Sequence, residues 1–116
     1  MQYLCLIYSD EATGPQHGTP EFGPYMQGYM EFTAKVQEDG VFVAGEGLQP
    51  VATASTVTME TGKPEITDGP FAETKEQLGG FYLLDCPDLD TALKYAVQIP
   101  TATHGRIEVR PVMNYD

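Results

Sequence analysis

Residues 79–86 read GGFYLLDC and lie at the centre of the expected architecture. Successive side chains of an extended strand point to opposite faces of a sheet, so Phe81 and Tyr82 lie on different faces, and both are apolar. Residues 2–8, QYLCLIY, are apolar on both faces in the same way. Such strands are typical of the interior of a sheet whose two faces are both covered. We therefore expect residues 2–8 and 79–86 to be the two central strands of one sheet.

The flanking segments predict two helices and further strands. Apolar residues at helical spacing indicate a helix over residues 24–39, with Pro24 in its first turn and Gly40 just past its end. A second helix follows the capping residue Asp88 and ends before Pro100. The other expected segments are a short apolar stretch at 41–44, strands at 51–59 and 105–113, and a Thr61-Gly62 turn leading into residues 63–67.

This order, β-α-β, hairpin, β-α-β, is that of the split-βαβ, ferredoxin-like fold, an α+β architecture with an antiparallel sheet. It places the more polar strands 51–59 and 105–113 at the sheet edges. Both helices cover one face, so the second apolar face needs a partner. A second copy packed sheet against sheet is the simplest partner and predicts a homodimer with a cleft between the sheets. The alternative is a monomer with an exposed aromatic face.

Length and charge narrow the possible functions. The chain has 116 residues, which fits a single domain over residues 1–116. Lys and Arg number 6 and Asp and Glu 17, giving a net charge of -11. This acidic balance argues against nucleic acid and against an anionic membrane surface, because both attract clustered Lys and Arg. The first apolar run is too short for a signal peptide, and no stretch is long enough to span a membrane. We expect a soluble cytoplasmic protein.

The cysteines, histidines and glycines indicate neither a metal nor a cofactor. Cys5 and Cys86 lie in apolar runs without CxxC spacing, which favours buried thiols over a disulfide or a zinc site. His17 and His104 are isolated and lack metal-ligand spacing. The glycines of residues 45–47 and 79–80 are not set between a strand and a helix as in a GxGxxG motif, so neither predicts a nucleotide site.

Three residues are candidates for acid/base chemistry or ligand binding in the loops. Asp68 belongs to an Asp-Gly-Pro turn, and a rigid loop carrying Asp68 and Glu73 is a suitable platform for acid/base groups. The alternative is a structural turn in which Asp68 accepts hydrogen bonds from local amides. His17 is a candidate general acid or base near neutral pH, with a solvated loop residue as its alternative.

Charged and aromatic residues elsewhere are candidates for substrate binding. Arg106, Glu108 and Arg110 alternate on one strand face, which must point toward the partner or the cleft because the other face packs on the helices. On that face Arg110 is able to hold a carboxylate or phenolate. The alternative is that these charged residues form an interfacial ion pair or a solvated sheet edge. Tyr25 and Tyr82, with Tyr29, are able to line an apolar pocket and orient a planar ligand, or else are simply core residues.

Several motifs together resemble one family. They are DGPF at 68–71, ETKE at 73–76, GGF at 79–81, YLCLIY at 3–8 and GRIEVRPV at 105–112. This pattern closely resembles the DGPF-motif proteins of the YCII-related family and covers nearly the whole chain. The resemblance implies the dimeric α+β barrel built from ferredoxin-like units.

The resemblance implies less about function. Some relatives resemble muconolactone isomerases, one branch performs dehydrochlorination in the breakdown of aromatic compounds, and genes for DGPF proteins often lie beside those for extracytoplasmic-function sigma factors. The leading hypothesis is a cofactor-independent enzyme or binder for a small aromatic or lactone-like acid, acting by proton transfer or elimination. Asp68 would be the acid/base group, Arg110 would hold the anion and Tyr82 would orient the ring. The alternatives are a non-catalytic interaction module in a sigma-factor-linked setting, which would bind through its acidic surface and residues 60–78, and a barrel that has lost its chemistry.

Overall fold

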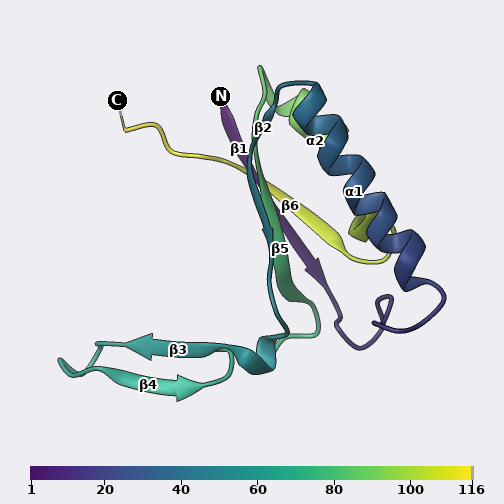
Figure 1. The fold of residues 1–116 in the computed structure, drawn as a ribbon. Helices are drawn as coiled ribbons and strands as arrows, with labels where there is room; N and C mark the ends of the chain where they lie inside the picture. Colours follow the sequence, from purple (N-terminus) through teal and green to yellow (C-terminus); the bar gives the residue numbers. More distant parts are fainter. Residues whose placement is uncertain (116) are drawn as a thin grey trace.

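The computed structural model describes residues 1–115 as a four-stranded sheet, two helices and a separate hairpin (Figure 1). The elements in chain order are β1 (Gln2–Ser9), α1 (Phe22–Glu38), β2 (Phe42–Gly47), the 3-10 helix η1 (Val51–Thr53), β3 (Ser55–Thr58), β4 (Glu65–Asp68), β5 (Gln77–Asp85), α2 (Leu89–Ala96), the 3-10 helix η2 (Pro100–Thr103) and β6 (Arg106–Pro111).

The main sheet has the strand order β2-β5-β1-β6, and all of its pairs are antiparallel. The two-sided apolar strands β1 and β5 are therefore central, as the sequence predicts, and Cys5 lies opposite Tyr82 in their register. Both helices lie on one side of the sheet (Figure 1). The α+β, ferredoxin-like prediction is confirmed.

The prediction of an edge strand over residues 51–59 is wrong. The edge position beside β5 belongs to β2, and the later segment forms η1 and then the two-stranded β3–β4 hairpin. The sequence pattern did not reveal β2 as the edge strand for a local reason. Its register with β5 is irregular between Phe42 and Ala44, and its glycines weaken the strand pattern. Its backbone nevertheless pairs with β5 as far as Gly47 opposite Gly80.

The helix boundaries follow from capping chemistry. The Asp88 carboxylate accepts a 2.8 Å hydrogen bond from the Thr91 amide at the start of α2, as its position predicts. At the end of α1, Gly40 has φ +76, a conformation that glycine adopts without strain. Pro100 opens η2 instead of extending α2.

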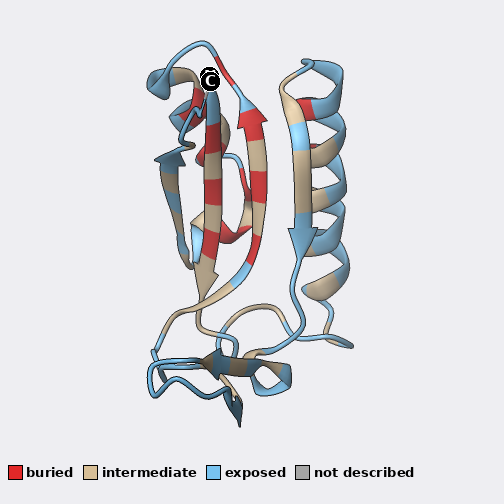
Figure 2. Ribbon diagram, turned by 90° about the vertical axis from the view of Figure 1, so that its left-hand side faces the viewer, coloured by how far each residue is buried: buried red, intermediate tan, exposed pale blue. Residues whose placement is uncertain are grey.

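The core lies between the helices and one face of the sheet. Buried positions alternate along β1 and β5 (Figure 2). The buried apolar residues are Tyr3, Cys5, Ile7, Phe32, Val36, Tyr82, Leu84, Cys86, Ala92, Ala96 and Ile99. Both cysteines are free and buried, as predicted. The same burial stabilises the fold through removal of apolar area from water.

The opposite face of the sheet, here called the open face, is also apolar. Leu4 pairs with Leu83 and Leu6 with Phe81, and all four side chains are only half-buried. On β6, Arg110 and Glu108 lie beside Leu4 and Leu6 in the register. The charged side chains of β6 thus alternate with its half-buried apolar ones, which confirms the predicted division of faces.

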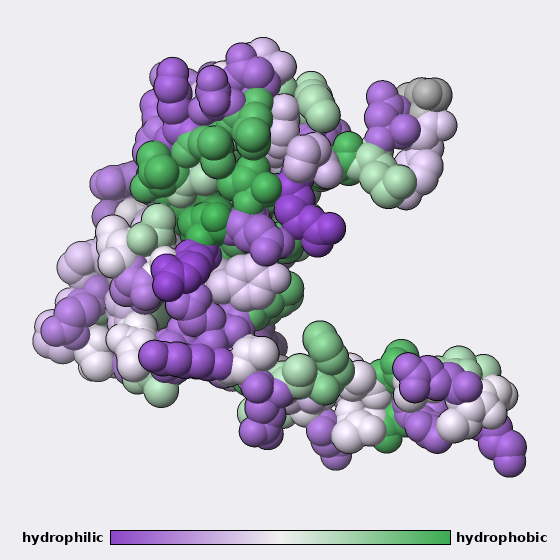
Figure 3. Space-filling view, turned by 180° about the vertical axis from the view of Figure 1, so that it is seen from behind, coloured by the Kyte–Doolittle hydropathy of each residue, from purple (hydrophilic) through white to green (hydrophobic). Residues whose placement is uncertain are grey.

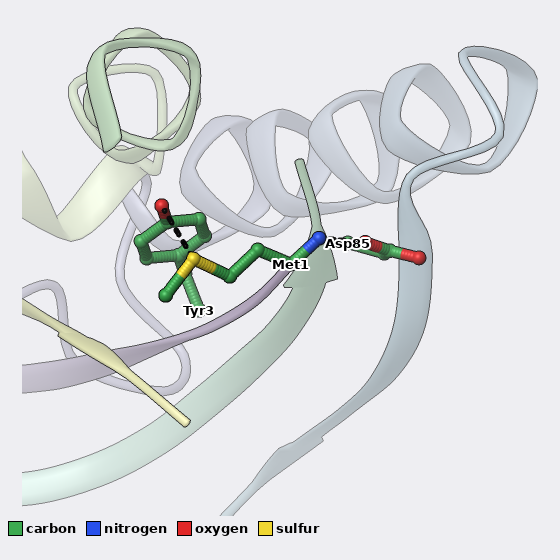
Figure 4. A network of polar contacts seen from close by, with 3 residues as sticks. All are labelled: Met1, Tyr3 and Asp85. Atoms are coloured by element: carbon green, nitrogen blue, oxygen red, sulfur yellow. Dashed lines mark hydrogen bonds and ion pairs between the residues drawn. The ribbon is translucent and has the colours of Figure 1, made fainter. Parts of the chain in front are cut away.

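Contacts at the start of the chain hold β1 against the end of β5 (Figure 4). The Met1 amino group lies 2.9 Å from the Asp85 carboxylate, and the Tyr3 hydroxyl donates to the Met1 sulfur at 3.4 Å. Both Met1 and Asp85 are exposed. This ion pair therefore contributes little stability but fixes the first residue beside the sheet.

The β3–β4 hairpin, here called the arm, projects from the body. The radius of gyration is 16.1 Å, against about 13 Å for a compact chain of this length. The arm and the C-terminal residues extend on the side of the open face, away from the helices (Figure 1). Figure 3 shows the resulting concave outline and a hydrophobic patch over α2, where Leu89, Leu93 and Val97 are exposed. Much apolar surface of this chain is thus left uncovered.

None of the helices in residues 1–115 has the length and hydrophobicity of a membrane span.

Alkaline pH should destabilise the fold through the buried thiol of Cys5. Burial, with a smaller contribution from Cys86, raises the pKa of Cys5 from 9.0 to about 11. The stabilisation is fully present below pH 9.0 and is lost as the pH rises to about 11, because only the unfolded chain readily loses this proton. We expect the free energy of unfolding, measured in urea, to fall over this range, and to fall less in Cys5→Val. Equal falls in both proteins would contradict this assignment.

Candidate functional site

A pocket of about 480 Å³ lies between α1 and the sheet, with η2 at one end. Its volume is within the range of small-molecule sites. Hydroxyl and aromatic groups dominate its side-chain lining. Its tyrosine and threonine side chains are Tyr25, Tyr29, Thr33, Tyr82 and Thr101.

The pocket exists because glycines replace side chains on the helix-facing side of the sheet. Gly80 shares that side with Tyr82, two residues on, and the register places Gly47 opposite Gly80 and Gly45 opposite Tyr82. A Cβ at Gly45 would lie 2.8 Å from the Tyr82 ring, and one at Gly80 2.8 Å from the Glu46 carbonyl oxygen. These two glycines permit the close approach of β2 to β5. At Gly47 a Cβ would meet nothing within 4 Å, so this position opens into empty space.

Two tyrosines of α1 share a buried threonine of η2. The Thr101 hydroxyl lies 2.5 Å from the hydroxyl of Tyr25 and 2.5 Å from that of Tyr29. Thr101 is only 2% exposed. The two tyrosine rings meet edge to face with centroids 5.3 Å apart. These three residues are called the first hydroxyl cluster.

A second hydroxyl cluster joins α1 to β5. The Thr33 and Tyr82 hydroxyl oxygens lie 2.6 Å apart. The Tyr82 ring is nearly parallel to that of Tyr29, with an interplanar angle of 8° and centroids 6.5 Å apart. Tyr29 of the first cluster and Tyr82 of the second are therefore neighbouring, nearly parallel rings in the same pocket.

Burial disfavours the ionised form of Tyr29 and Tyr82. It raises the pKa of Tyr29 well above its ordinary value, and the opposing effect of the Thr101 hydrogen bond is smaller. Burial likewise raises the pKa of Tyr82 more than its Thr33 hydrogen bond lowers it. These hydroxyls are thus hydrogen-bond donors at neutral pH. Donors fixed in a site of low polarity stabilise negative charge that develops on a bound oxygen.

The structure places Tyr25 and Tyr82, among the residues named from sequence, in the pocket. Arg110 is exposed on β6, where it lies opposite Leu4 on the other face of the sheet. The sequence predicted a ligand cleft between two facing sheets, whereas the pocket within this chain lies on the helix side. The difference arises because the Tyr82 side chain points toward the helices.

The predicted acid/base residues lie outside the pocket. Asp68 is exposed at the end of β4 in the arm, and Glu73 is exposed in the segment that follows. His17 is exposed and stacks on Phe22, with ring centroids 4.6 Å apart. The histidine beside the tyrosines is His104, whose ring centroid lies 5.6 Å from that of Tyr25. The three acid/base candidates are not brought together.

The pocket carries little charge. Glu46 is its one charged lining residue, and no Lys, Arg or His among residues 1–115 lines it. The described residues also hold no group of three or more His, Cys, Asp or Glu able to ligate a metal ion. The chemistry that these residues offer is hydrogen bonding by hydroxyls around an apolar space.

Thr101 was not singled out from sequence, and the pocket glycines were considered there only as a nucleotide-binding motif, which they do not form. Thr101 lies 72 residues from Tyr29 along the chain, and local patterns give no sign of this pairing. The glycines did carry a signal, because Gly80 and Gly45 interrupt the apolar alternation on the face that packs on the helices.

Comparison with known proteins places the chain in a family. The YCII-related domain matches residues 1–116. The chain belongs to the YCII-related family. The chain is 38% identical over 117 residues to an uncharacterized protein of Rhizobium meliloti (strain 1021). The alignment covers 99% of this chain and 94% of the relative.

A solved structure shares the YCII-related chain's fold. It is 5-chloro-2-hydroxyhydroquinone dehydrochlorinase from Burkholderia phenoliruptrix AC1100, in complex with 2,5-dihydroxybenzoquinone. The TM-score is 0.52 at 12% identity, covering 97% of this chain and 94% of the enzyme. At this identity the likeness concerns the fold.

Proposed function

We propose that this protein is a cofactor-independent enzyme or binding protein for small planar aromatic compounds, which it holds in the pocket between α1 and the sheet. The observation that carries the proposal is the set of five tyrosine and threonine hydroxyls around an apolar space lined by aromatic rings. The structural neighbour, an enzyme of the same fold named for a chlorinated hydroxyhydroquinone, supports this ligand class. The reaction class is proton transfer or elimination.

The pocket favours ring oxygens over carboxylates. A buried carboxylate needs a cationic partner, and Arg110 lies on the other face of the sheet. A phenol or quinone oxygen needs only hydroxyl donors, which Tyr29 and Tyr82 supply. In an elimination or isomerisation these donors would stabilise an enolate-like oxygen as charge builds on the ring.

A homodimer is part of the same proposal. The open face is apolar and uncovered, and the arm projects on that side (Figure 1). Asp68 and Glu73 lie on or beside the arm, so in a dimer they would face the second copy. Any acid/base role of these carboxylates would then be played across the dimer, with Arg110 on the shared face.

A thermal-shift experiment tests the ligand class. Hydroquinone, phenol and 2,5-dihydroxybenzoquinone are added to the wild type and to Tyr95→Phe, a half-buried tyrosine outside the pocket that donates to Asp39. A ligand at about 100 times its dissociation constant adds roughly 2.7 kcal/mol, which moves the midpoint by about 10 °C in a domain of this size. We expect this shift in both proteins. Release of chloride from 5-chloro-2-hydroxyhydroquinone would then identify an enzyme, and no shift with any compound would overturn the proposal.

The second candidate function is an interaction module, favoured by the arm. Val57 and Ile66 pair across it and are 69% and 71% exposed, and Phe71 beside it is 89% exposed. An isolated hairpin has little stability in water, so this one needs a surface to pack on. If the module hypothesis holds, a chain lacking residues 55–68 loses a protein partner but keeps its Tm response to small ligands unchanged.

A further inference from the structure

Two arginines of β6 project from the open face, and only one of them has a carboxylate partner in the described part of its own chain. Arg106 lies opposite Tyr8, at the end of the sheet where the arm is attached, and its Nε atom is 3.8 Å from a Glu76 carboxylate oxygen. Arg110 lies opposite Leu4, at the other end. Among the described residues its guanidinium has no ion pair and no hydrogen bond. An unpaired guanidinium on an apolar surface needs an anion once that surface is covered.

The arm is acidic. Residues 55–68 contain Glu60, Glu65 and Asp68 and the single cation Lys63. Asp68 ends β4 where the arm joins the body, and it is exposed. Its carboxylate has no ion pair and no hydrogen bond within the part of the chain that the structure describes. Each chain therefore presents an unpaired anion at the base of the arm and an unpaired cation at the opposite end of the open face.

The arm is long enough to reach past a second copy. Each of its strands has four residues. Such a strand is about 13 Å long, whereas two packed sheets lie about 10 Å apart. The arm projects on the side of the open face (Figure 1). When a second copy covers that face, the arm therefore lies against one end of the second copy.

The direction of the arm is fixed by hydrogen bonds at its base. The Gly69 amide donates to the Ala54 carbonyl at 2.7 Å, and the Thr56 hydroxyl donates to the Gly69 carbonyl at 2.8 Å. The Val51 amide of η1 donates to the Glu11 carboxylate at 3.0 Å. A segment that is already held in position loses little conformational entropy when it docks.

A two-fold dimer through the open faces has two limiting arrangements. With the arms at the same end, the two acidic arms meet, and their like charges repel. With the arms at opposite ends, each arm meets the end of the sheet that carries Arg110 of the second copy. That end also has Met113 and Tyr115, which are 72% and 87% exposed and match the exposed Val57 and Ile66 of the arm. Charge and hydrophobicity both favour the second arrangement.

We infer that the arm of each copy lies across the far end of the other copy's open face, where Asp68 pairs with Arg110. The inference rests on the homodimer of the proposed function and specifies how the two copies face each other. Asp68 is at the base of the arm, so it borders the gap between the sheets into which Arg110 points. Glu65 is about 10 Å farther along the strand and lies beyond that gap. The two-fold symmetry forms the contact twice.

Two single charge reversals test this contact by sedimentation equilibrium without ligand. In Asp68→Arg alone and in Arg110→Asp alone, the dimer places like charges together at both contacts. We expect the dissociation constant of each to rise at least about tenfold. A mixture of the two variants should form the mixed dimer. In it the substituted residues face each other with opposite charges, as do the two unchanged ones, and we expect a dissociation constant within about threefold of wild type.

Matched controls carry the same charge changes on the helices. Glu31→Arg on α1 and Lys94→Asp on α2 are at exposed positions, and both helices lie on the opposite side of the sheet (Figure 1). These variants alter the net charge by the same amounts as the test variants. We expect each to change the dissociation constant by no more than about twofold and to show no preference for a mixed dimer. Circular dichroism of each variant confirms that it is folded.

The outcomes separate this inference from the homodimer itself. A monomeric wild type removes both. If the wild type is a dimer and both reversals behave like their controls, the homodimer stands but the arm does not lie against Arg110, and the inference is overturned. In that case the arm is free for a different protein, as the interaction module requires. The inference is also overturned if both reversals weaken the dimer and mixing does not restore it, because Asp68 and Arg110 then do not meet between copies.

Discussion

Replacing Gly47 with leucine should abolish ligand binding while the protein stays folded. Gly47 is on the helix-facing side of β2, and a Cβ there meets no atom within 4 Å. Its φ is not positive, so a side chain introduces no backbone strain. The leucine would occupy the space into which a ring must fit. We expect at least about a 30-fold loss in affinity for hydroquinone, since overlap with a packed side chain costs a few kcal/mol.

Gly80 and Gly45 do not give so clear a test. Alanine at Gly80 would press on the Glu46 carbonyl oxygen and separate β2 from β5, and alanine at Gly45 would displace the Tyr82 ring. Gly23→Leu is the matched control, because its Cβ also meets nothing within 4 Å but the residue lies in the first turn of α1, outside the pocket. If Gly47→Leu binds as tightly as Gly23→Leu, the ligand site lies elsewhere.

The parts of the fold that the sequence predicts correctly are governed by local chemistry. The two-sided apolar pattern of β1 and β5 follows from strand period and burial alone. Asp88 signals the start of α2 because a carboxylate there satisfies free amides, whatever the rest of the chain does. The division of faces on β6 is visible in the sequence because the charged residues Arg106, Glu108 and Arg110 alternate with apolar ones.

The parts that it misses depend on contacts between distant residues. β2 is recognisable as a sheet edge only through its pairing with β5, because its own glycines resemble a loop. Residues 51–59 have the composition of a strand, but only Ser55–Thr58 form one, and its partner is β4 in the arm. Composition indicates that a strand exists and does not say which strand it joins.

The same distinction between local chemistry and contacts of distant residues explains which predicted site residues lie in the pocket. Tyr25 and Tyr82 were chosen as pocket residues for their chemistry, and the structure does place them in the pocket. Asp68 and His17 were chosen for their chemistry too, but the turn and loop that carry them lie away from it. Chemical type identifies candidates, and only the tertiary path of α1, β5 and η2 determines which of them meet.

Replacing Leu6 with aspartate should convert a homodimer into monomers. Leu6 lies in the middle of the open face, beside Phe81 in one neighbouring strand and Glu108 in the other. Two copies packed through this face would bury one aspartate from each, directly beside the like charge of Glu108. An unpaired buried charge costs about 3 kcal/mol or more. Each such cost corresponds to about a 100-fold rise in the dissociation constant, and the symmetry of the dimer applies it twice.

The measurement is sedimentation equilibrium over a range of concentrations, and the control tests which face is used. Leu93→Asp introduces the same charge at an exposed apolar position on α2, on the helix side. We expect the wild type and Leu93→Asp to be dimers, and Leu6→Asp to be a folded monomer, because Leu6 is only half-buried in the single chain. A monomeric wild type would refute the homodimer. A dimer lost in Leu93→Asp and kept in Leu6→Asp would place the interface on α2, where Leu89 and Val97 extend the same apolar patch (Figure 3).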